Sequence, residues 1–256
     1  MKKSFWTVLC ASALLLFSTM PAGAFEIGAR ALYWFPTMNA DMRADTEARV
    51  GTTLDIKDTL GVDNKSFPTF EAFAGVGKHR LTLAYTPISY SGSATLATPV
   101  TFDGRVFAAG TGVNSDLKLR MLDLEYQYKF LDLENILAGF SLSAIGQVKY
   151  IDGEARMEAP ATATAADVTV NVPVPMVGLG AHIGLLAGLL EARAKVTGVA
   201  YSNNYLYEAL ADLSLTPFPF LDIHGGYKII GLKIDRNDFF LDSRFAGPYV
   251  ALTVSF

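Results

Sequence analysis

Cysteine and histidine are scarce in this chain. Its 256 residues include one cysteine, Cys10, and three histidines, at positions 79, 182 and 224. A single cysteine excludes an intrachain disulfide framework, and the wide separation of the histidines matches neither a metal site nor a catalytic triad. We therefore expect no cofactor, no metal site and no catalytic residue, and a fold stabilised by other means.

Long apolar runs are also missing beyond residue 24. The best candidate for a membrane-spanning helix, residues 176–190, has fifteen residues, is interrupted by His182 and contains four glycines. A spanning helix needs about 20 predominantly apolar residues. We expect the glycines to relieve crowding or allow bending in a strand, and we expect no transmembrane helix.

The first 24 residues have the pattern of a secretory signal peptide. Lys2 and Lys3 precede an apolar stretch, residues 6–17, which is followed by small residues up to Ala24. We expect cleavage before Phe25, which leaves 232 residues, no cysteine and a net charge of −6 instead of −4, because two lysines are removed. A mildly acidic exported chain is not expected to bind nucleic acid.

Strict alternation of apolar and polar residues dominates the remainder. In residues 122–130, leucine, tyrosine and phenylalanine alternate with Asp123, Glu125, Gln127 and Lys129. The same pattern returns in residues 190–197, 207–216 and 221–229. Because successive side chains of a strand point to opposite faces, these segments predict strands with one apolar and one charged face.

Two features indicate that lipid covers the apolar face. Aromatic residues gather toward the ends of the predicted strands, at 33–35, 126–130, 201–207 and 218–220, as in the girdles of transmembrane barrels. The polar face carries charges of both signs, which suits a lumen. A soluble exported β-sandwich is the alternative.

The last nine residues provide a third feature. Val250, Leu252, Val254 and Phe256 share one face. This segment resembles the C-terminal strand of bacterial outer-membrane barrels, in which a terminal aromatic and alternating apolar residues are recognised by the barrel-assembly machinery. The whole chain resembles the small outer-membrane barrel class that includes OmpA-type and OmpW-type barrels. This resemblance implies a location in the Gram-negative outer membrane, with lipid, lipopolysaccharide and the assembly machinery as partners and a monomer as the favoured state.

Backbone groups in hydrocarbon must be paired, so we expect a closed all-β, antiparallel, up-and-down barrel of residues 25–256. Ten strands are predicted, with eight as the alternative, at 25–35, 67–77, 80–90, 116–130, 136–150, 173–186, 189–201, 205–216, 221–233 and 247–256. The connections at 78–79, 131–135, 187–188 and 217–220 are short and are assigned to the periplasm. Those at 36–66, 91–115, 151–172 and 234–246 are long and are assigned to the outside, together with a tight turn at 202–204.

The polar phase of these strands predicts a set of charges that face the lumen. The set is nearly balanced, which favours a salt-bridged plug over an ion-conducting channel, because a barrel of this size is almost filled by side chains. Its members are Glu26, Arg30, Asp123, Glu125, Lys129, Lys149, Glu191, Arg193, Lys195, Glu208, Asp212, Asp222 and Lys228.

The long connections add three expectations. Residues 52–63 contain the apolar pair Ile56 and Leu60 followed by Gly61, which predicts a helical turn that packs the loop. Residues 159–167, rich in alanine and threonine, are expected to be flexible and exposed. Residues 235–244 combine acids with arginines, a pattern of a solvated surface or, as a minor alternative, of lipopolysaccharide binding.

Two roles follow from these features. The first is a non-enzymatic barrel, either structural or a narrow, porin-like passage for small solutes. The second is an outer-membrane enzyme that acts on lipid or peptide, which is disfavoured because the outer loops contain no histidine to act as a base.

Overall fold

The structure, a computed structural model, describes residues 25–45, 50–133, 139–186, 189–236 and 239–256. The predicted signal peptide and parts of two predicted turns, 131–135 and 187–188, lie outside the described residues and stay predictions. In the described ranges no helix is long and apolar enough to span a membrane.

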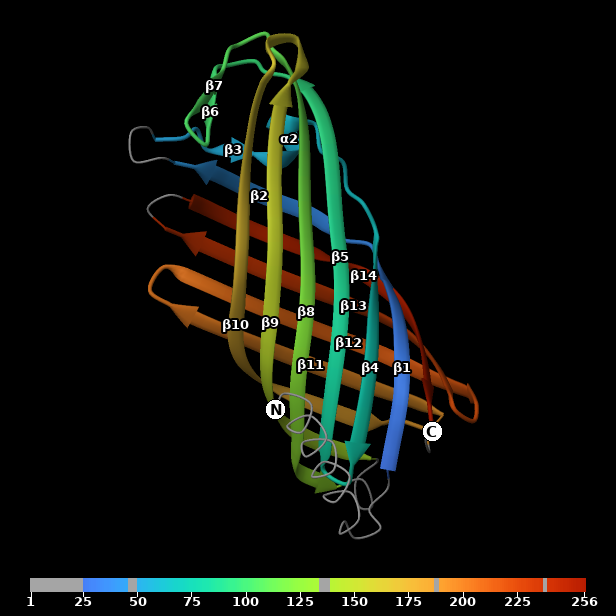
Figure 1. The fold of residues 1–256 in the computed structure, drawn as a ribbon. Coiled ribbons are helices and arrows are strands. Elements are labelled where there is room, and N and C mark those ends of the chain that lie inside the picture. Colours follow the sequence, from blue (N-terminus) through green and yellow to red (C-terminus); the bar gives the residue numbers. More distant parts are fainter. Residues whose placement is uncertain (1–24, 46–49, 134–138, 187–188, 237–238) are drawn as a thin grey trace, which may run out of the picture.

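Ten antiparallel strands form the wall of a closed barrel (Figure 1). The sheet closes because β1 pairs with β4 on one side and with β14 on the other. This confirms the predicted ten-strand barrel, and the alternatives of eight strands and of an open sandwich are wrong. The wall strands are β1 (Phe25–Trp34), β4 (Phe67–Val76), β5 (His79–Thr95), β8 (Gly112–Leu133), β9 (Phe140–Ala159), β10 (Thr164–Gly184), β11 (Leu190–Tyr201), β12 (Asn204–Phe218), β13 (Leu221–Asp235) and β14 (Phe239–Ser255).

The longer connections gather at one end of the barrel, called here the loop end, and the other end is called the turn end (Figure 1). Between β1 and β4 lie β2 (Thr37–Ala44), β3 (Leu54–Asp55) and the helix α2 (Ile56–Leu60), and β2 pairs with the first half of β14. The hairpin of β6 (Val100–Phe102) and β7 (Arg105–Phe107) connects β5 to β8, and a short turn, η1 (Pro160–Thr162), connects β9 to β10.

Helix α2 confirms the expected helical turn in residues 52–63. The Asp55 side chain caps it by accepting a hydrogen bond from the Asp58 backbone, and Gly61 ends it in the left-handed conformation, at φ 65°. Ile56 and Leu60 are both buried. The helix therefore packs the loop, as expected.

Several strands are longer than the sequence predicts. Residues 151–159, 164–172 and 239–246 belong to strands, so the expectation of long connections there is wrong. Exposure, expected for residues 159–167, is confirmed at 160–163, 165 and 167 but is wrong for Ala159 and Ala166, which are buried. The expected flexibility of this segment stays a prediction. Residues 239–244 likewise lie in β14 and do not form a loop, although Asp235 and Arg244 are exposed, as expected of a solvated surface.

The exterior of the wall changes from apolar to polar along β5 and β10 and from apolar to charged along β8 and β9. On β8 and β9, Leu124 lies opposite Val148 and Leu122 opposite Tyr150, and these exterior side chains are exposed. One exterior row further toward the loop end, Arg120 lies opposite Asp152, and the rows beyond it are charged as well. We call the apolar zone below this boundary the apolar belt.

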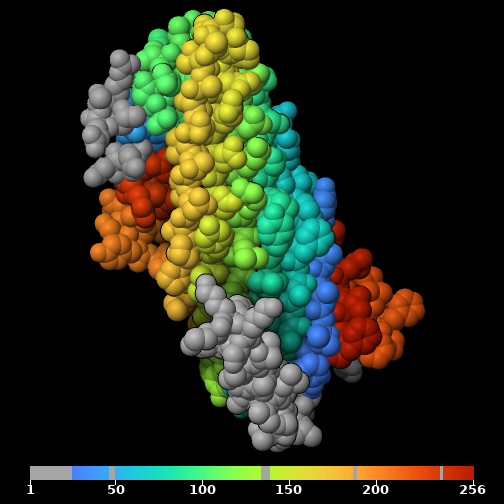
Figure 2. Space-filling model, viewed as in Figure 1, coloured from blue at the N-terminus to red at the C-terminus, as the bar shows by residue number. Residues whose placement is uncertain are grey.

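The interior shows the opposite arrangement. Beyond the boundary, toward the loop end, the inward side chains form a hydrophobic core that includes Met121, Ile151, Tyr90 and Phe245. Trp34 is fully buried in it and donates a hydrogen bond from Nε1 to the Gly247 carbonyl at 3.1 Å. Figure 2 shows β8 to β10, green to gold, as one continuous wall, with the orange and red strands β11 to β14 emerging behind it on both sides.

Candidate functional site in the barrel lumen

The turn-end half of the lumen contains a cavity of about 810 Å³. Its lining is mostly polar and charged, with Arg30, Arg80, Glu125, His182 and Lys195 among its residues. The expectation that ten strands leave little room is therefore wrong for this half. Antiparallel strands bring these side chains together by sending every second residue inward.

A layer of buried ion pairs lies between this cavity and the hydrophobic core. Lys149 of β9 is fully buried and lies 2.6 Å from Asp123 of β8 and 2.9 Å from Glu208 of β12. Lys228 of β13 approaches Glu208 at 3.3 Å. Such charges are costly to bury alone, and their mutual pairing offsets that cost. We call this set the ion layer.

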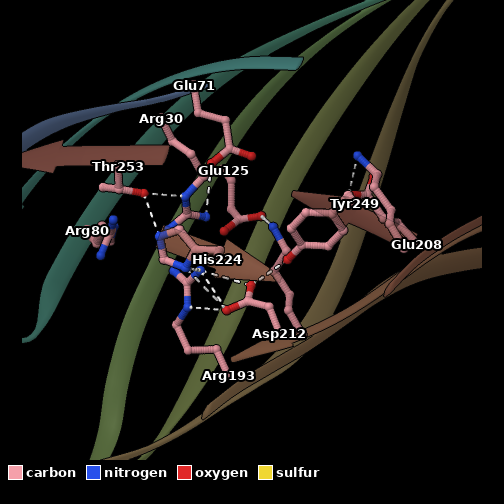
Figure 3. Close-up of polar contacts among 12 residues, drawn as sticks. Arg30, Glu71, Arg80, Glu125, Arg193, Glu208, Asp212, His224, Tyr249 and Thr253 are labelled. Atoms are coloured by element: carbon pink, nitrogen blue, oxygen red, sulfur yellow. Dashed lines mark hydrogen bonds and ion pairs between the residues drawn. The ribbon is translucent and has the colours of Figure 1, made fainter. Parts of the chain in front are cut away.

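Asp212 is the centre of a second polar cluster (Figure 3). It receives hydrogen bonds from Arg193, at 2.9 and 3.0 Å, and from the Tyr249 hydroxyl. His224 lies 3.5 Å from the same carboxylate and contacts Thr253 through Nε2 at 2.8 Å. The cluster connects four strands that are neighbours in the wall, β11 to β14.

Thr253, His224 and Asp212 are arranged like the nucleophile, base and acid of a catalytic triad. The protonation of His224 decides whether it can act as the base. The Arg193 guanidinium, which can only donate, lies 3.1 Å from His224 Nδ1. This contact requires a lone pair on Nδ1, so in the neutral ring Nε2 carries the proton and donates to Thr253. A histidine in this state cannot take a proton from Thr253. The geometry is that of a structural crosslink, reinforced by Arg30 Nε donating to Thr253 at 2.8 Å.

The structure places the sequence-predicted charges as follows. Those that line the cavity are Glu26, Arg30, Glu125, Lys129, Glu191, Arg193, Lys195 and Asp222. Those buried in the ion layer or the Asp212 cluster are Asp123, Lys149, Glu208, Asp212 and Lys228. On the exterior, Val250, Leu252, Val254 and Phe256 are exposed, and their role in assembly stays a prediction.

Sequence reasoning missed Glu71, Arg80 and Tyr249. Glu71 pairs with Arg30 at 3.3 Å, and the Arg80 guanidinium lies 3.8 Å from the centre of the Phe73 ring while pairing with Glu26. Aromatic residues occupy both faces of β4, which hides the alternation that would have placed Glu71 inside. It also missed the hydrophobic core, because apolar inward residues were not expected in a charged lumen.

The remaining histidines have local partners. His79 is the first residue of β5, and its Nδ1 lies 2.6 Å from the Tyr126 hydroxyl. His182 lies 3.1 Å from Glu191 at the cavity wall. Across the part of the chain that the structure describes, no group of three histidine, cysteine or acidic residues is arranged to hold a metal ion.

The fold has counterparts among solved structures. The outer-membrane protease OmpT from Escherichia coli matches with a TM-score of 0.57 and 9% identity, over 91% of this chain and 98% of that chain. This chain has the fold of a small outer-membrane β-barrel. Ail of Yersinia pestis (TM-score 0.36, 8% identity, 90% and 99% coverage) and the Pseudomonas putida toluene transporter TodX (0.33, 8%, 93% and 91%) also match, at scores too low to carry an argument.

At 9% identity the likeness to the protease concerns the fold alone. No family model and no curated protein sequence matches the chain. The activity of any one of these barrels is therefore not transferred to this chain by similarity.

Proposed function

We propose that this chain is a non-enzymatic outer-membrane barrel whose lumen is closed. The apolar belt supports the membrane location: its exterior side chains include Leu124 and Val250, which are 48% and 55% exposed. A monomeric soluble protein rarely exposes a continuous apolar band of this kind. The charged rows beyond the belt then lie in the headgroup region, and the loop end faces outside.

Closure of the lumen is the observation that carries the proposal. Lys149 is fully buried in the ion layer, which occupies the middle of the barrel. Beyond it the core fills the loop-end half, where Trp34 and Tyr90 are also fully buried. A hydrated path needs polar walls that contact water, and this half offers apolar, packed walls instead. The cavity is therefore a recess that opens at the turn end.

The arrangement of the lumen also supports a structural role over an enzymatic one. His224 is held as a donor to Thr253, and His182 and His79 have partners of their own. In the described ranges, no histidine lies at the loop end, where an enzyme acting on external peptide or lipid would need a base. The ion pairs crosslink strands that are distant in sequence, which makes the barrel a rigid anchor in the membrane.

Conductance across a planar bilayer tests the closed lumen. The mature chain is refolded from inclusion bodies, its folding is checked by the difference in gel migration between boiled and unboiled samples, and it is added to the bilayer. We expect no steady current, while a general porin added to the same bilayer produces stable steps. Large, stable steps from the correctly folded chain would overturn the closed lumen.

A further inference from the structure

The barrel is closed at the turn end, but toward the loop end the strand β10 has an unpaired edge. β10 pairs with β9 from Thr164 to His182, but β11 joins its other side only from Val177 to Gly184. Within the described ranges, residues 164–176 of β10 have no strand partner on that second side. The hydrogen-bonded ladder of the wall therefore has a gap beside the loop-end half of β10, which β11 to β14 cross in the view of Figure 1.

The gap crosses the boundary of the apolar belt. Asn171 of β10 lies in the exterior row of Asp152 and Arg120, outside the belt. Pro173 lies in the next exterior row, with Tyr150, inside the belt. The open edge thus begins among lipid tails and continues beyond the hydrocarbon.

The backbone of the open edge is adapted to hydrocarbon within the belt. Pro173 and Pro175 occupy alternate positions of β10, and a proline fits the β9 ladder only where its nitrogen points away from β9. At these two positions the open edge therefore has no N–H group to leave unpaired in lipid, and its only backbone polar groups there are the carbonyls of Pro173 and Pro175. The N–H of Thr169 also points to the open edge, but Thr169 lies outside the belt, where water can form a hydrogen bond with that N–H.

The side chains behind the edge are apolar and half-buried. Val168, Val170, Val172 and Val174 face inward, and each is only partly covered by the core. Beyond the boundary of the belt, a narrow cleft of about 30 Å³ lies between Val168 and Val170 of this edge and β13–β14, where Ile234 and Phe239 form the facing wall. Deeper in the sheet, Met121 and Ile151 occupy the same inward row as Val172 and are 1% and 3% exposed.

From these observations we propose that the open edge of β10 binds a single hydrocarbon chain, the acyl tail of an outer-leaflet lipid. The proposal rests on the proposed membrane location. The tail lies along the rim of the cleft, covers the valine row and replaces the missing strand partner with hydrocarbon. Continuity with the belt, the two prolines and the apolar lining all favour a lipid tail over a peptide strand, which would need backbone donors along the edge.

Photolabelling of the mature chain tests this proposal. The chain is refolded into phosphatidylcholine vesicles that contain a fraction of phosphatidylcholine with a diazirine in one acyl chain, irradiated, and mapped by mass spectrometry. We expect adducts at inward Val172 and Val174, at exterior Leu122 as the positive control, and none at Met121. Adducts at Leu122 without any at Val172, Val174 or Phe239 would overturn the proposal.

A pair of variants locates the tail. Val170→Trp fills the cleft and is expected to reduce adducts at Phe239 severalfold, whereas Thr169→Trp, on the exterior face of the same edge, leaves them unchanged. Unchanged adducts at Phe239 in folded Val170→Trp would overturn the assigned site. If Leu122 also remains unlabelled in the unmodified chain, the membrane location itself fails. Protection of the Thr169 amide from exchange would indicate a strand partner and contradict the lipid tail.

Discussion

Arg120 and Leu122 are neighbours on the exterior face of β8, and the boundary of the apolar belt passes between them. Arg120 forms an ion pair with Asp152 at 2.6 Å, whereas Leu122 lies opposite Tyr150 and is 43% exposed. The inward residues change in the reverse sense, from Met121 in the core to Asp123 in the ion layer. Along this one strand, the exterior changes from charged to apolar at the point where the interior changes from the hydrophobic core to the ion layer.

A charge placed within the belt tests this boundary. Leu124→Lys puts an ammonium group among lipid tails and is expected to lower the free energy of unfolding in vesicles by about 2–4 kcal/mol. Ser93→Lys, on an exposed exterior position beyond the belt, is expected to change it by about 0–1 kcal/mol, as near an interface. Urea unfolding followed by tryptophan fluorescence measures both, and equal effects would contradict the assigned boundary.

The ion layer predicts a large effect from one substitution. Lys149→Met leaves Asp123 and Glu208 facing each other in a buried site, and removing one partner of a buried ion pair costs about 3–5 kcal/mol. Lys118→Met breaks the exposed pair with Glu154, at 3.9 Å, and should cost about 0–1 kcal/mol. The same unfolding measurement compares them; a Lys149→Met barrel as stable as Lys118→Met would show that the layer does not stabilise the fold.

The alternation of the sequence was sufficient to predict the barrel, but only the part of it within the apolar belt. The predicted strands 136–150 and 173–186 end or begin within one residue of the belt boundary at Tyr150 and Pro173. At that boundary Tyr150 faces out and Ile151 faces in, so two apolar residues are adjacent and the alternation in the sequence is interrupted. Beyond the boundary the strand continues, but its apolar residues now point inward. The sequence prediction assumed apolar residues on the exterior and therefore ended the strand there.

The sequence could predict which residues point into the lumen, but not which of these residues pair with one another. Lys149 and Glu208 belong to strands that are not neighbours in the sheet, β9 and β12. Their contact depends on the register and tilt of the whole barrel, which local periodicity does not specify. For the same reason the sequence did not indicate the open edge of β10 or the core above the ion layer.

Replacing a proline of the wall by alanine is expected to lower the stability of the barrel more inside the apolar belt than outside it. Pro175→Ala adds an N–H to the open edge inside the belt, in the exterior row of Val148 and Leu124, and an unpaired donor there should cost about 1–3 kcal/mol. Pro87→Ala adds an N–H in the row of Arg120, where water satisfies it. Both changes alter the unfolded chain equally. Thermal unfolding in vesicles should separate them, and a Pro175→Ala effect no larger than that of Pro87→Ala would contradict a lipid-facing edge.

Location in a membrane requires that hydrocarbon cover the exterior side chains of the belt, such as those of Leu124, Val148 and Val250. Flotation of the refolded mature chain with phosphatidylcholine vesicles in a density gradient measures this. We expect the folded chain to float with the vesicles at high salt and to aggregate in plain buffer without detergent. A monodisperse chain in plain buffer that stays at the bottom of the gradient would contradict the account.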